Sequence, residues 1–147
     1  MSLLDELNGY YFDELSEGMS AVFGKTVTEA DIVNFAGVSG DTNPVHLNAD
    51  YAAETMFKGR IAHGILTASF ISTVIGTRLP GPGCIYVSQN LRFKAPVMIG
   101  DTVIARIVIT KLIPEKRFLE MSTICTVADK VVLEGEATVM APKRPQA

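Results

Sequence analysis

The sequence contains no tryptophan, and only two histidines and two cysteines occur among its 147 residues. Cys84 and Cys125 belong to no CxxC or Cys/His pair, which argues against a zinc site or a disulfide framework. We expect both to be free thiols in a reducing compartment. The scarcity of histidine also limits the places where proton transfer near neutral pH can occur.

Positive charge is also in short supply. The 13 Lys and Arg are outnumbered by 16 Asp and Glu, giving a net charge of −3. This balance lacks the basic surface of a nucleic-acid binder, so no nucleic-acid partner is expected. The first residues have neither the basic nor the apolar part of a secretory signal. The longest uncharged run, residues 61–77, is slightly short for a membrane span and is interrupted by polar and small residues. We therefore expect a soluble cytoplasmic protein with no membrane partner.

What the chain does have is apolar residues, at 48%, against 20% charged residues. This composition excludes intrinsic disorder. A chain of this length forms one domain and buries roughly 68% of its unfolded surface. We therefore predict a single domain over residues 1–147, with residues 1–17 as an N-terminal arm. The expected anchors of this arm are apolar: Leu3, Leu4, Tyr10, Tyr11 and Phe12.

The first half of the chain has helical signals after one short strand, residues 19–26. A capping box at Thr28 and Asp31 predicts a short helix, followed by a loop at residues 39–44. Asn48 or Asp50 could cap a second short helix that extends to Met56. Residues 61–77 predict a third helix, apolar on more than one face and therefore enclosed on several sides.

The second half has the pattern of strands. Residues 85–93 alternate, and residues 102–113, 118–127 and 131–140 are rich in β-branched side chains separated by short turns. Consecutive strands with such turns form an antiparallel meander. The expected fold class is α+β, with the sheet wrapped around the apolar helix. Because an open sheet edge must be covered or paired, we also expect a homodimer with a continuous sheet.

The segment that carries chemistry is SGDTNPVH, residues 39–46. It places Asp41 and His46 on either side of a turn that Pro44 stiffens. A rigid loop suits two groups that hold one water between them, and histidine is the side chain best suited to proton transfer near neutral pH. Turn formation alone also explains the Asp, Asn, Pro and Gly, although it leaves His46 between two apolar residues unexplained.

A second feature is Gly64, near the start of the apolar helix. A helix N-terminus presents unpaired N–H groups and partial positive charge, and glycine allows close approach. This is a plausible oxyanion-binding position, although close packing alone would also explain the glycine. His63, the residue before it, receives no chemical role.

Together these segments resemble a known family. Residues 35–46 (FAGVSGDTNPVH) look like the hydratase signature of the MaoC-like dehydratases, especially the (R)-specific enoyl-CoA hydratases. Residues 60–68 (RIAHGILTA), 79–83 (LPGPG), 91–97 (LRFKAPV) and 100–101 (GD) also follow the family pattern. The resemblance covers nearly all of residues 18–142. It implies the hot-dog fold, an antiparallel sheet wrapped around a central helix, in a homodimer or a higher homo-oligomer.

The resemblance also implies the activity and the site. Asp41 and His46 match the catalytic pair, the N–H of Gly64 matches the group that binds the thioester carbonyl, and Asn43 and Ser72 match supporting residues. The implied reaction is hydration of a trans-2-enoyl-CoA to an (R)-3-hydroxyacyl-CoA, and its reverse. The partner is thus an acyl-CoA thioester. No cofactor and no metal are expected, because coenzyme A is part of the substrate.

Other functions stay open at this level. A hot-dog thioesterase would attack the carbonyl carbon instead of Cβ, and a 3-hydroxyacyl dehydratase could act on acyl carrier protein. An acyl-CoA-binding domain without turnover is the non-enzymatic alternative. Candidate partners for the coenzyme A phosphates are the cations near the motifs, although each could equally be a solvated surface charge: Lys58, Arg60, Arg78, Arg92 and Lys94.

Overall fold

The second half of the chain forms the antiparallel meander that its β-branched segments predict. In a computed structural model that describes residues 2–145, three long strands pair in chain order: β4 (Thr102–Ile113), β5 (Phe118–Val127) and β6 (Lys130–Met140). Alternate side chains of β4, such as Ala105 and Ile107, are buried. This period of two is the one expected of a sheet with one face against a core.

Two further strands extend the sheet to an order of β1-β4-β5-β6-β2. The first, β1 (Ser20–Thr26), pairs with β4, and β2 (Ile85–Gln89) pairs with β6. The two-residue strand β3 (Arg92–Phe93) also pairs with β6. All of these pairings are antiparallel. In the strand order, β1 and β2 are the two end strands.

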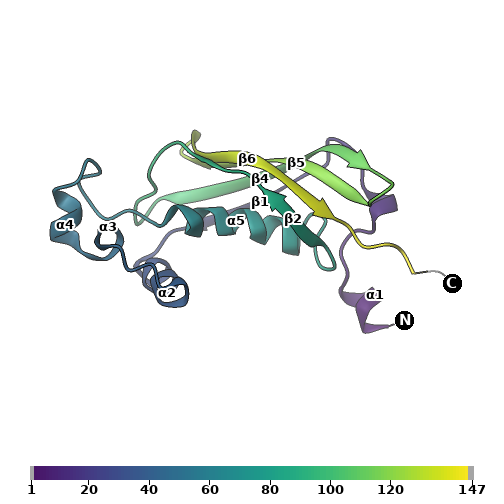
Figure 1. The fold of residues 1–147 in the computed structure, drawn as a ribbon, viewed down its shortest axis with the longest axis horizontal. Helices are drawn as coiled ribbons and strands as arrows, with labels where there is room; N and C mark the ends of the chain where they lie inside the picture. The colour runs from purple at the N-terminus through teal and green to yellow at the C-terminus, as the bar shows by residue number, and fades with distance from the viewer. Residues whose placement is uncertain (1, 146–147) are drawn as a thin grey trace.

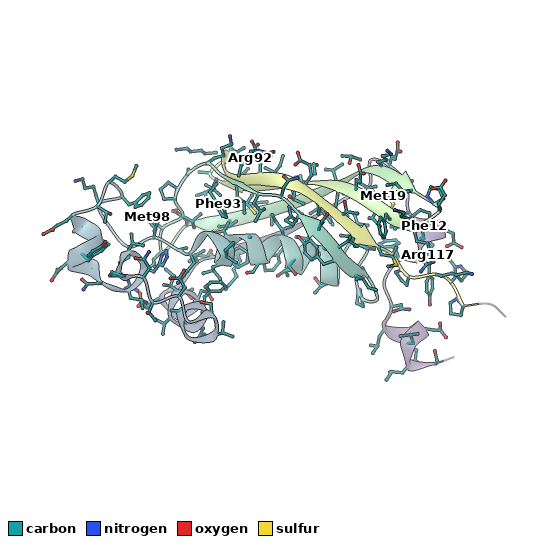
Figure 2. All side chains as sticks on the ribbon, viewed as in Figure 1. Phe12, Met19, Arg92, Phe93, Met98 and Arg117 are labelled. Carbon is teal, nitrogen blue, oxygen red and sulfur yellow. The ribbon has the colours of Figure 1, made fainter. Side chains whose placement is uncertain are left out.

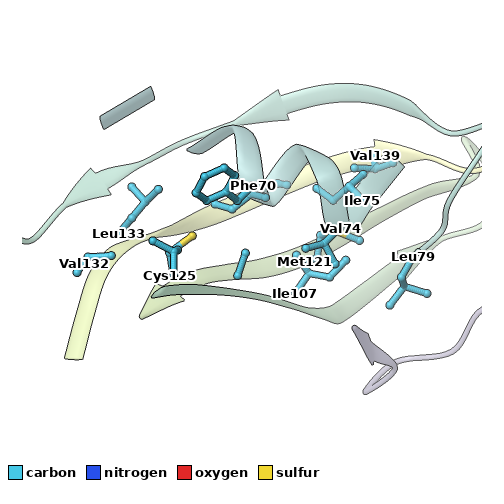
Figure 3. Packing of buried hydrophobic residues seen from close by; sticks show 14 of the residues in the cluster. Phe70, Val74, Ile75, Leu79, Ile107, Met121, Cys125, Val132, Leu133 and Val139 are labelled. Atoms are coloured by element: carbon cyan, nitrogen blue, oxygen red, sulfur yellow. The ribbon is translucent and has the colours of Figure 1, made fainter. Parts of the chain in front are cut away.

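Helix α5 (Gly64–Thr77) lies across one face of this sheet (Figure 1). The α+β arrangement of a sheet wrapped around a central helix, the hot-dog fold, is therefore confirmed. The prediction that the helix is enclosed on several sides is only partly correct, because Ile65 is 57% exposed and Ser72 is exposed on its outer side. Buried residues of α5 and of the strands form one core cluster, which includes Leu66 and Ile71. Figure 3 labels further members of this cluster: Phe70, Val74, Ile75, Ile107, Met121 and Val139.

The central helix begins later than its apolar sequence predicts. It starts at Gly64 instead of Ile61, because the preceding residues pair with an extended segment. Ile61 forms an isolated antiparallel bridge with Met98, and the N–H of Ala62 donates to the carbonyl of Val97 at 2.7 Å. Apolar composition alone could not separate these two extended residues from the helix that follows.

The predicted strand over residues 85–93 is interrupted. It divides into β2 and β3, with Asn90 between them. Asn90 packs onto Gly135 of β6 so closely that a Cβ built on this glycine would lie 1.9 Å from the Asn90 carbonyl oxygen. The glycine makes the break possible, and it redirects the chain before β3.

The helix α2 (Glu29–Ser39) begins at the predicted capping box. The N–H of Asp31 donates to Oγ1 of Thr28, and the Asp31 carboxylate accepts from the N–H of Thr28. The helix ends at Gly40, whose φ of +79° requires the left-handed region that glycine adopts without strain. The capping prediction is confirmed.

Two very short helices follow, α3 (Pro44–Leu47) and α4 (Ala49–Ala53). The side chain of Asn48 accepts from the N–H of Tyr51 at 2.9 Å, so Asn48, one of the two candidates, is the cap. The helix ends before the predicted Met56. Helices α2, α3 and α4 lie together beyond one end of α5 (Figure 1).

The N-terminal arm contains helix α1 (Leu3–Leu7) and a 3₁₀ turn, η1 (Phe12–Glu14). The expectation that Leu3 and Leu4 anchor the arm is wrong, because they are 69% and 64% exposed. The arm is held further along: Leu15 is buried, and Phe12 packs against the core. The described part of the predicted arm is residues 2–17; the remaining residue, 1, lies outside the described range.

Both cysteines are free, as expected. Cys84 is half-buried and Cys125 is buried. Burial raises the pKa of the Cys125 thiol to about 12, since a thiolate would be poorly solvated there. Across residues 2–145, every helix is too short or too polar to cross a bilayer.

Candidate active site

The loop after α2 holds Asp41 by turn chemistry. The N–H of Asn43 donates to Oδ1 of Asp41 at 3.2 Å, and Oδ1 of Asn43 accepts from the N–H of Val45 at 3.1 Å, which caps α3. The interpretation of this segment as a turn is therefore correct, and the same hydrogen bonds orient the carboxylate. Asn43 acts as a cap, consistent with an orienting role.

His46 follows on α3 and is only 7% exposed. Its Nδ1 lies 2.8 Å from the carbonyl oxygen of Ile61. Because a carbonyl oxygen can only accept, Nδ1 carries the hydrogen and Nε2 of the neutral ring presents a lone pair. The backbone thus fixes both the orientation of the ring and its tautomer.

Asp41 and His46 lie close to each other, together with His63. One ligand-type atom from each of these three side chains lies within 4.8 Å of the others. Two hydrogen bonds of about 2.8 Å that meet at one water oxygen span nearly this distance. The exposed carboxylate of Asp41 and the buried imidazole of His46 can therefore hold one water between them.

Gly64 is the first residue of α5. His63 is the N-cap residue but provides no side-chain cap within the described chain, so the first N–H groups of the helix lack that acceptor. A Cβ built on Gly64 would lie 2.6 Å from the ring of Phe93, a residue labelled in Figure 2. Glycine leaves the Phe93 ring in place, whereas a side chain would require that ring, which is 54% exposed, to move. Gly64 is exposed at the start of the helix, a position that suits the binding of an oxyanion.

Sequence reasoning missed His63. The side chain is 2% exposed, and its ring stacks on that of His46 with centroids 3.8 Å apart. Its Nε2 lies 2.9 Å from the carbonyl oxygen of Asp41. The spacing of His63 from the loop carries no periodic signal; its position directly before Gly64 was the one available indication.

The same three side chains lie close enough together to be considered as metal ligands. The two imidazole rings are stacked, with planes 26° apart. One nitrogen of each ring faces a backbone carbonyl, which leaves the other nitrogen of each ring and the Asp41 carboxylate. These groups can also hold a water molecule by hydrogen bonds, and the absence of a metal stays a prediction.

A cavity of about 560 Å³ adjoins Gly64. Its lining is mainly apolar, with the Lys94 side chain among the few polar groups, so it suits an apolar or weakly polar chain. The lining comes from the α4–α5 connection, from α5, from β6 and from the segment that begins at β3: Met56, Phe57, Ile61, Ala62, Gly64, Ile65, Thr67, Phe93, Lys94, Ala95, Pro96, Val97, Val132 and Leu133.

Ser72 lies farther along α5. Eight residues of helix place it about 12 Å from Gly64. The alternative serine, Ser69, is half-buried and its hydroxyl donates to the carbonyl of Leu66 in its own helix. Ser72 is exposed on the open side of α5, so it is the serine that can contact a bound molecule or a second chain.

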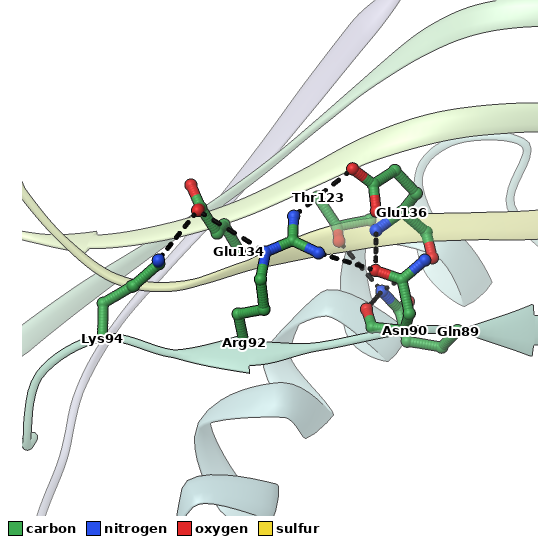
Figure 4. Close-up of polar contacts among 7 residues, drawn as sticks. All are labelled: Gln89, Asn90, Arg92, Lys94, Thr123, Glu134 and Glu136. Atoms are coloured by element: carbon green, nitrogen blue, oxygen red, sulfur yellow. Dashed lines mark hydrogen bonds and ion pairs between the residues drawn. The ribbon is translucent and has the colours of Figure 1, made fainter.

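Most of the candidate phosphate-binding cations have partners within the chain. Arg92 and Lys94 both lie near Glu134, at 3.7 Å and 3.6 Å, and Arg92 also reaches Glu136 at 3.4 Å (Figure 4). Arg78 donates to the carbonyl of Val22. These contacts favour structural roles for the three cations.

Arg60 has an additional place in the site. Its Nε donates to the carbonyl of His46 at 2.6 Å. Its two terminal nitrogens donate to the two carboxylate oxygens of Glu29, at 2.8 Å and 3.0 Å. Arg60 therefore links the segment that carries His46 to the start of α2. Of the five candidate cations, Arg60 is half-buried and the other four are exposed.

Comparisons with known proteins agree with this geometry. The family model described as MaoC like domain matches residues 14–134. An (R)-specific enoyl-CoA hydratase of Rhodospirillum rubrum is 62% identical over 140 residues, 95% of this chain and 97% of that protein. A 3-hydroxybutyryl-CoA dehydratase of Methylorubrum extorquens is 48% identical over 99% of this chain and 92% of that protein.

A solved structure of an R-hydratase from Pseudomonas aeruginosa superposes with a TM-score of 0.88 at 45% identity, covering 94% of this chain and 89% of that one. The R-hydratase of Aeromonas caviae gives 0.84 at 39% identity, covering 87% and 98%. The sequence motifs, the sheet around α5 and these likenesses lead to one conclusion: the chain belongs to the MaoC-like family of dehydratases and hydratases.

Proposed function

We propose that the protein adds water to trans-2-enoyl-CoA, giving (R)-3-hydroxyacyl-CoA, and catalyses the reverse dehydration. The observation that carries this proposal is the closeness of Asp41 and His46, within 4.8 Å, beside the exposed start of α5. The names of the relatives support it, since both of the curated relatives described above are named for enoyl-CoA hydration or its reverse. The product of the family reaction sets the expected (R) configuration.

In this mechanism the thioester carbonyl accepts a hydrogen bond from the N–H of Gly64. Negative charge grows on that oxygen as water attacks Cβ, and the positive end of the α5 dipole stabilises it. A short distance away, Asp41 and Nε2 of His46 both accept from the attacking water. Its oxygen bonds to Cβ, and its proton passes through the pair to Cα on the same face. Asp41 is the proposed base, with His46 sharing the water and the proton transfer.

No cofactor takes part in this proposal, because hydration moves a water and a proton and changes no oxidation state overall. The apolar cavity beside Gly64 supports binding of a thioester with a largely apolar arm. Ser72 is proposed as a supporting residue on the open face of α5. The free, poorly ionised thiols suit a reducing compartment such as the cytoplasm, where we place the reaction.

We also propose that the working unit is a homodimer joined along β2. This strand ends the sheet order, and its apolar residues Ile85 and Val87 are 56% and 46% exposed. Pairing of β2 with β2 of a second copy would satisfy the edge and cover the open side of α5. Light scattering after size exclusion should give twice the chain mass, and Val87→Lys should shift it towards the monomer. A stable wild-type monomer would overturn this part.

The decisive experiment is a hydration assay. Loss of the conjugated thioester absorbance is followed with crotonyl-CoA and with longer enoyl-CoAs, and the product is resolved on a chiral column. We expect turnover and an (R) product. An (S) product, or absence of turnover in protein that is folded, would contradict the proposal.

Three parallel measurements separate the alternatives. Release of free thiol from acyl-CoA would indicate a thioesterase. Faster turnover of the same enoyl group on acyl carrier protein would indicate a carrier-linked dehydratase, the activity in the name of a tomato relative that is 37% identical over 80% of this chain. Tight binding of 3-hydroxyacyl-CoA without turnover would indicate a binding domain.

A further inference from the structure

His63 is the most deeply buried polar group near the proposed site. The ring is 2% exposed and has the ring of Phe35 at 4.8 Å, tilted by 55°, besides the stacked ring of His46 at 3.8 Å. Its neighbours are thus aromatic, and a phenylalanine or leucine would fill the same space without a polar atom. The presence of an imidazole therefore needs a reason other than packing.

The two nitrogens of the ring have different surroundings. Nε2 lies 2.9 Å from the carbonyl oxygen of Asp41, and since that oxygen only accepts, Nε2 carries the hydrogen. Nδ1 then has a lone pair, and it is buried without a hydrogen-bond partner among residues 2–145. An unpaired buried nitrogen disfavours folding. Because a histidine is present despite this unfavourable unpaired Nδ1, we infer that the contact made by Nε2 is useful.

That contact links the three functional groups of the proposed site. His63 immediately precedes Gly64, holds the backbone of Asp41 through Nε2, and supports the ring of His46 by stacking. One rigid, buried ring therefore sets the position of the carboxylate, the imidazole and the oxyanion-binding N–H relative to one another.

We propose that His63 is a positioning residue of the hydratase, acting through Asp41 and His46 without touching the substrate. The inference rests on the proposed function. Displacing a catalytic group by about 1 Å can lower a rate by about 10²-fold. Loss of the Nε2 contact should therefore reduce kcat by much more than it changes KM.

Two variants separate the two contacts. His63→Gln places an amide N–H near the position of Nε2 but removes the ring, whereas His63→Phe keeps a ring that can stack on His46 but removes the donor. We expect His63→Phe to lose about 10²-fold in kcat and His63→Gln to lose about tenfold, both with KM within about threefold of wild type. Phe35→Leu, which alters packing on His63 without a polar contact, is the matched control and should keep kcat within about threefold.

A double-mutant cycle tests whether His63 acts through Asp41. Groups that work as a unit have strongly non-additive effects, so His63→Phe should cost less than about threefold in the Asp41→Asn background. An equal loss in both backgrounds, or wild-type kcat in folded His63→Phe, would overturn the proposal. If His63→Phe does not fold by circular dichroism, His63→Asn replaces it: its amide is too short to reach Asp41, so it should be slower than His63→Gln, and equal rates would overturn the proposal.

These outcomes remain distinguishable from failure of the proposed function. If the wild-type protein does not hydrate any enoyl-CoA, the function itself is wrong and the variants are not needed to show it. If the wild type is active and the order of the His63 variants is reversed, only the positioning role is wrong.

Discussion

The sheet with α5 and the end of the molecule that carries Asp41 and His46 are held together in different ways. Between the sheet and the helix, the contacts are apolar and regular, and alternate residues are buried over most of β4 and β5. At the other end the elements are short, and side chains form hydrogen bonds with backbone carbonyls. His46 bonds to the carbonyl of Ile61, Arg60 to that of His46, and His63 to that of Asp41.

The difference has a physical consequence. Apolar burial has no preferred direction and tolerates small shifts, so it supports stability without fixing atoms very precisely. Hydrogen bonds to carbonyls fix both distance and angle, which a site needs if it must hold one water. We therefore expect core substitutions to change mainly stability, and substitutions at the site end to change mainly activity.

The largest expected effect is on activity at the proposed pair. Asp41→Asn and His46→Gln each replace a group that can take up a proton by an amide that cannot, and general acid–base help is typically worth about 10²–10⁴-fold in rate. We expect each to lose at least the lower figure in crotonyl-CoA hydration. Urea titration should give unfolding midpoints close to wild type. Wild-type turnover by both folded variants would show that the site lies elsewhere.

The next largest effect is on stability, and it is expected in the core. Ile107 is fully buried in the cluster between β4 and α5. Ile107→Ala should lower the free energy of unfolding by about 2–5 kcal/mol, because it removes apolar contacts and leaves a cavity. Activity per folded molecule should stay within about threefold, since the site has its own polar fastening. If folded Ile107→Ala loses much more than threefold in activity, the proposed separation between a stabilising core and a catalytic end is wrong.

A smaller effect on both properties is expected at Arg60, which joins the two regions. Arg60→Met keeps an apolar stem but loses the hydrogen bond to the His46 carbonyl and the grip on Glu29. We expect stability to fall by about 1–2 kcal/mol and kcat to fall by about tenfold. Glu29→Gln is the control: the Glu29 side chain is 56% exposed, so losing that ion pair should cost less than about 1 kcal/mol.

The smallest expected effect is at the cap of α2, and it depends on pH. Burial acts to raise the pKa of Asp31, but hydrogen bonds from Thr28 and from the Lys25 ammonium outweigh it and hold the pKa below its usual value. Thr28→Ala should cost about 1 kcal/mol of stability. A carboxyl whose pKa is lower in the folded than in the unfolded protein stabilises the fold at pH values above its unfolded pKa. Asp31→Asn should therefore be destabilising at neutral pH.

That destabilisation by Asp31→Asn should shrink as the pH falls below about 4, where the wild-type carboxyl takes up its proton. Chemical denaturation of both proteins at several pH values measures the difference directly. A constant difference down to pH 2 would mean that Asp31 stabilises the helix without its charge. At neutral pH, folded Asp31→Asn should have the same hydration activity as the wild type.

Much of the sheet could be predicted from the sequence because its signals are local. The bounds of β4 and β5 match the β-branched segments, and Thr28 and Asp31 form the capping box that their spacing indicates. The break at Asn90 could not be predicted, because it depends on contact with Gly135, which is distant in the sequence. The late start of α5 has a similar cause, since Ile61 bridges to Met98.

The same distinction holds for the site. Asp41 and His46 are close in sequence, and the stiff turn between them indicated a shared water; Gly64 was found from its place at the start of a helix. His63 was missed although it directly precedes Gly64, since its contacts with Asp41 and His46 depend on how α5 meets the loop. Sequence patterns reveal groups that a turn or a helix end presents, and only the fold shows which buried ring supports them.

The tight contact between Gly64 and Phe93 couples the two positions. A Cβ at position 64 would lie 2.6 Å from the Phe93 ring, so a side chain there requires the ring to move. Phe93 is 54% exposed, and its ring has room to turn towards solvent. A small side chain at position 64 therefore changes where the Phe93 ring lies, and its effect should be smaller in a variant that already has a small residue at position 93.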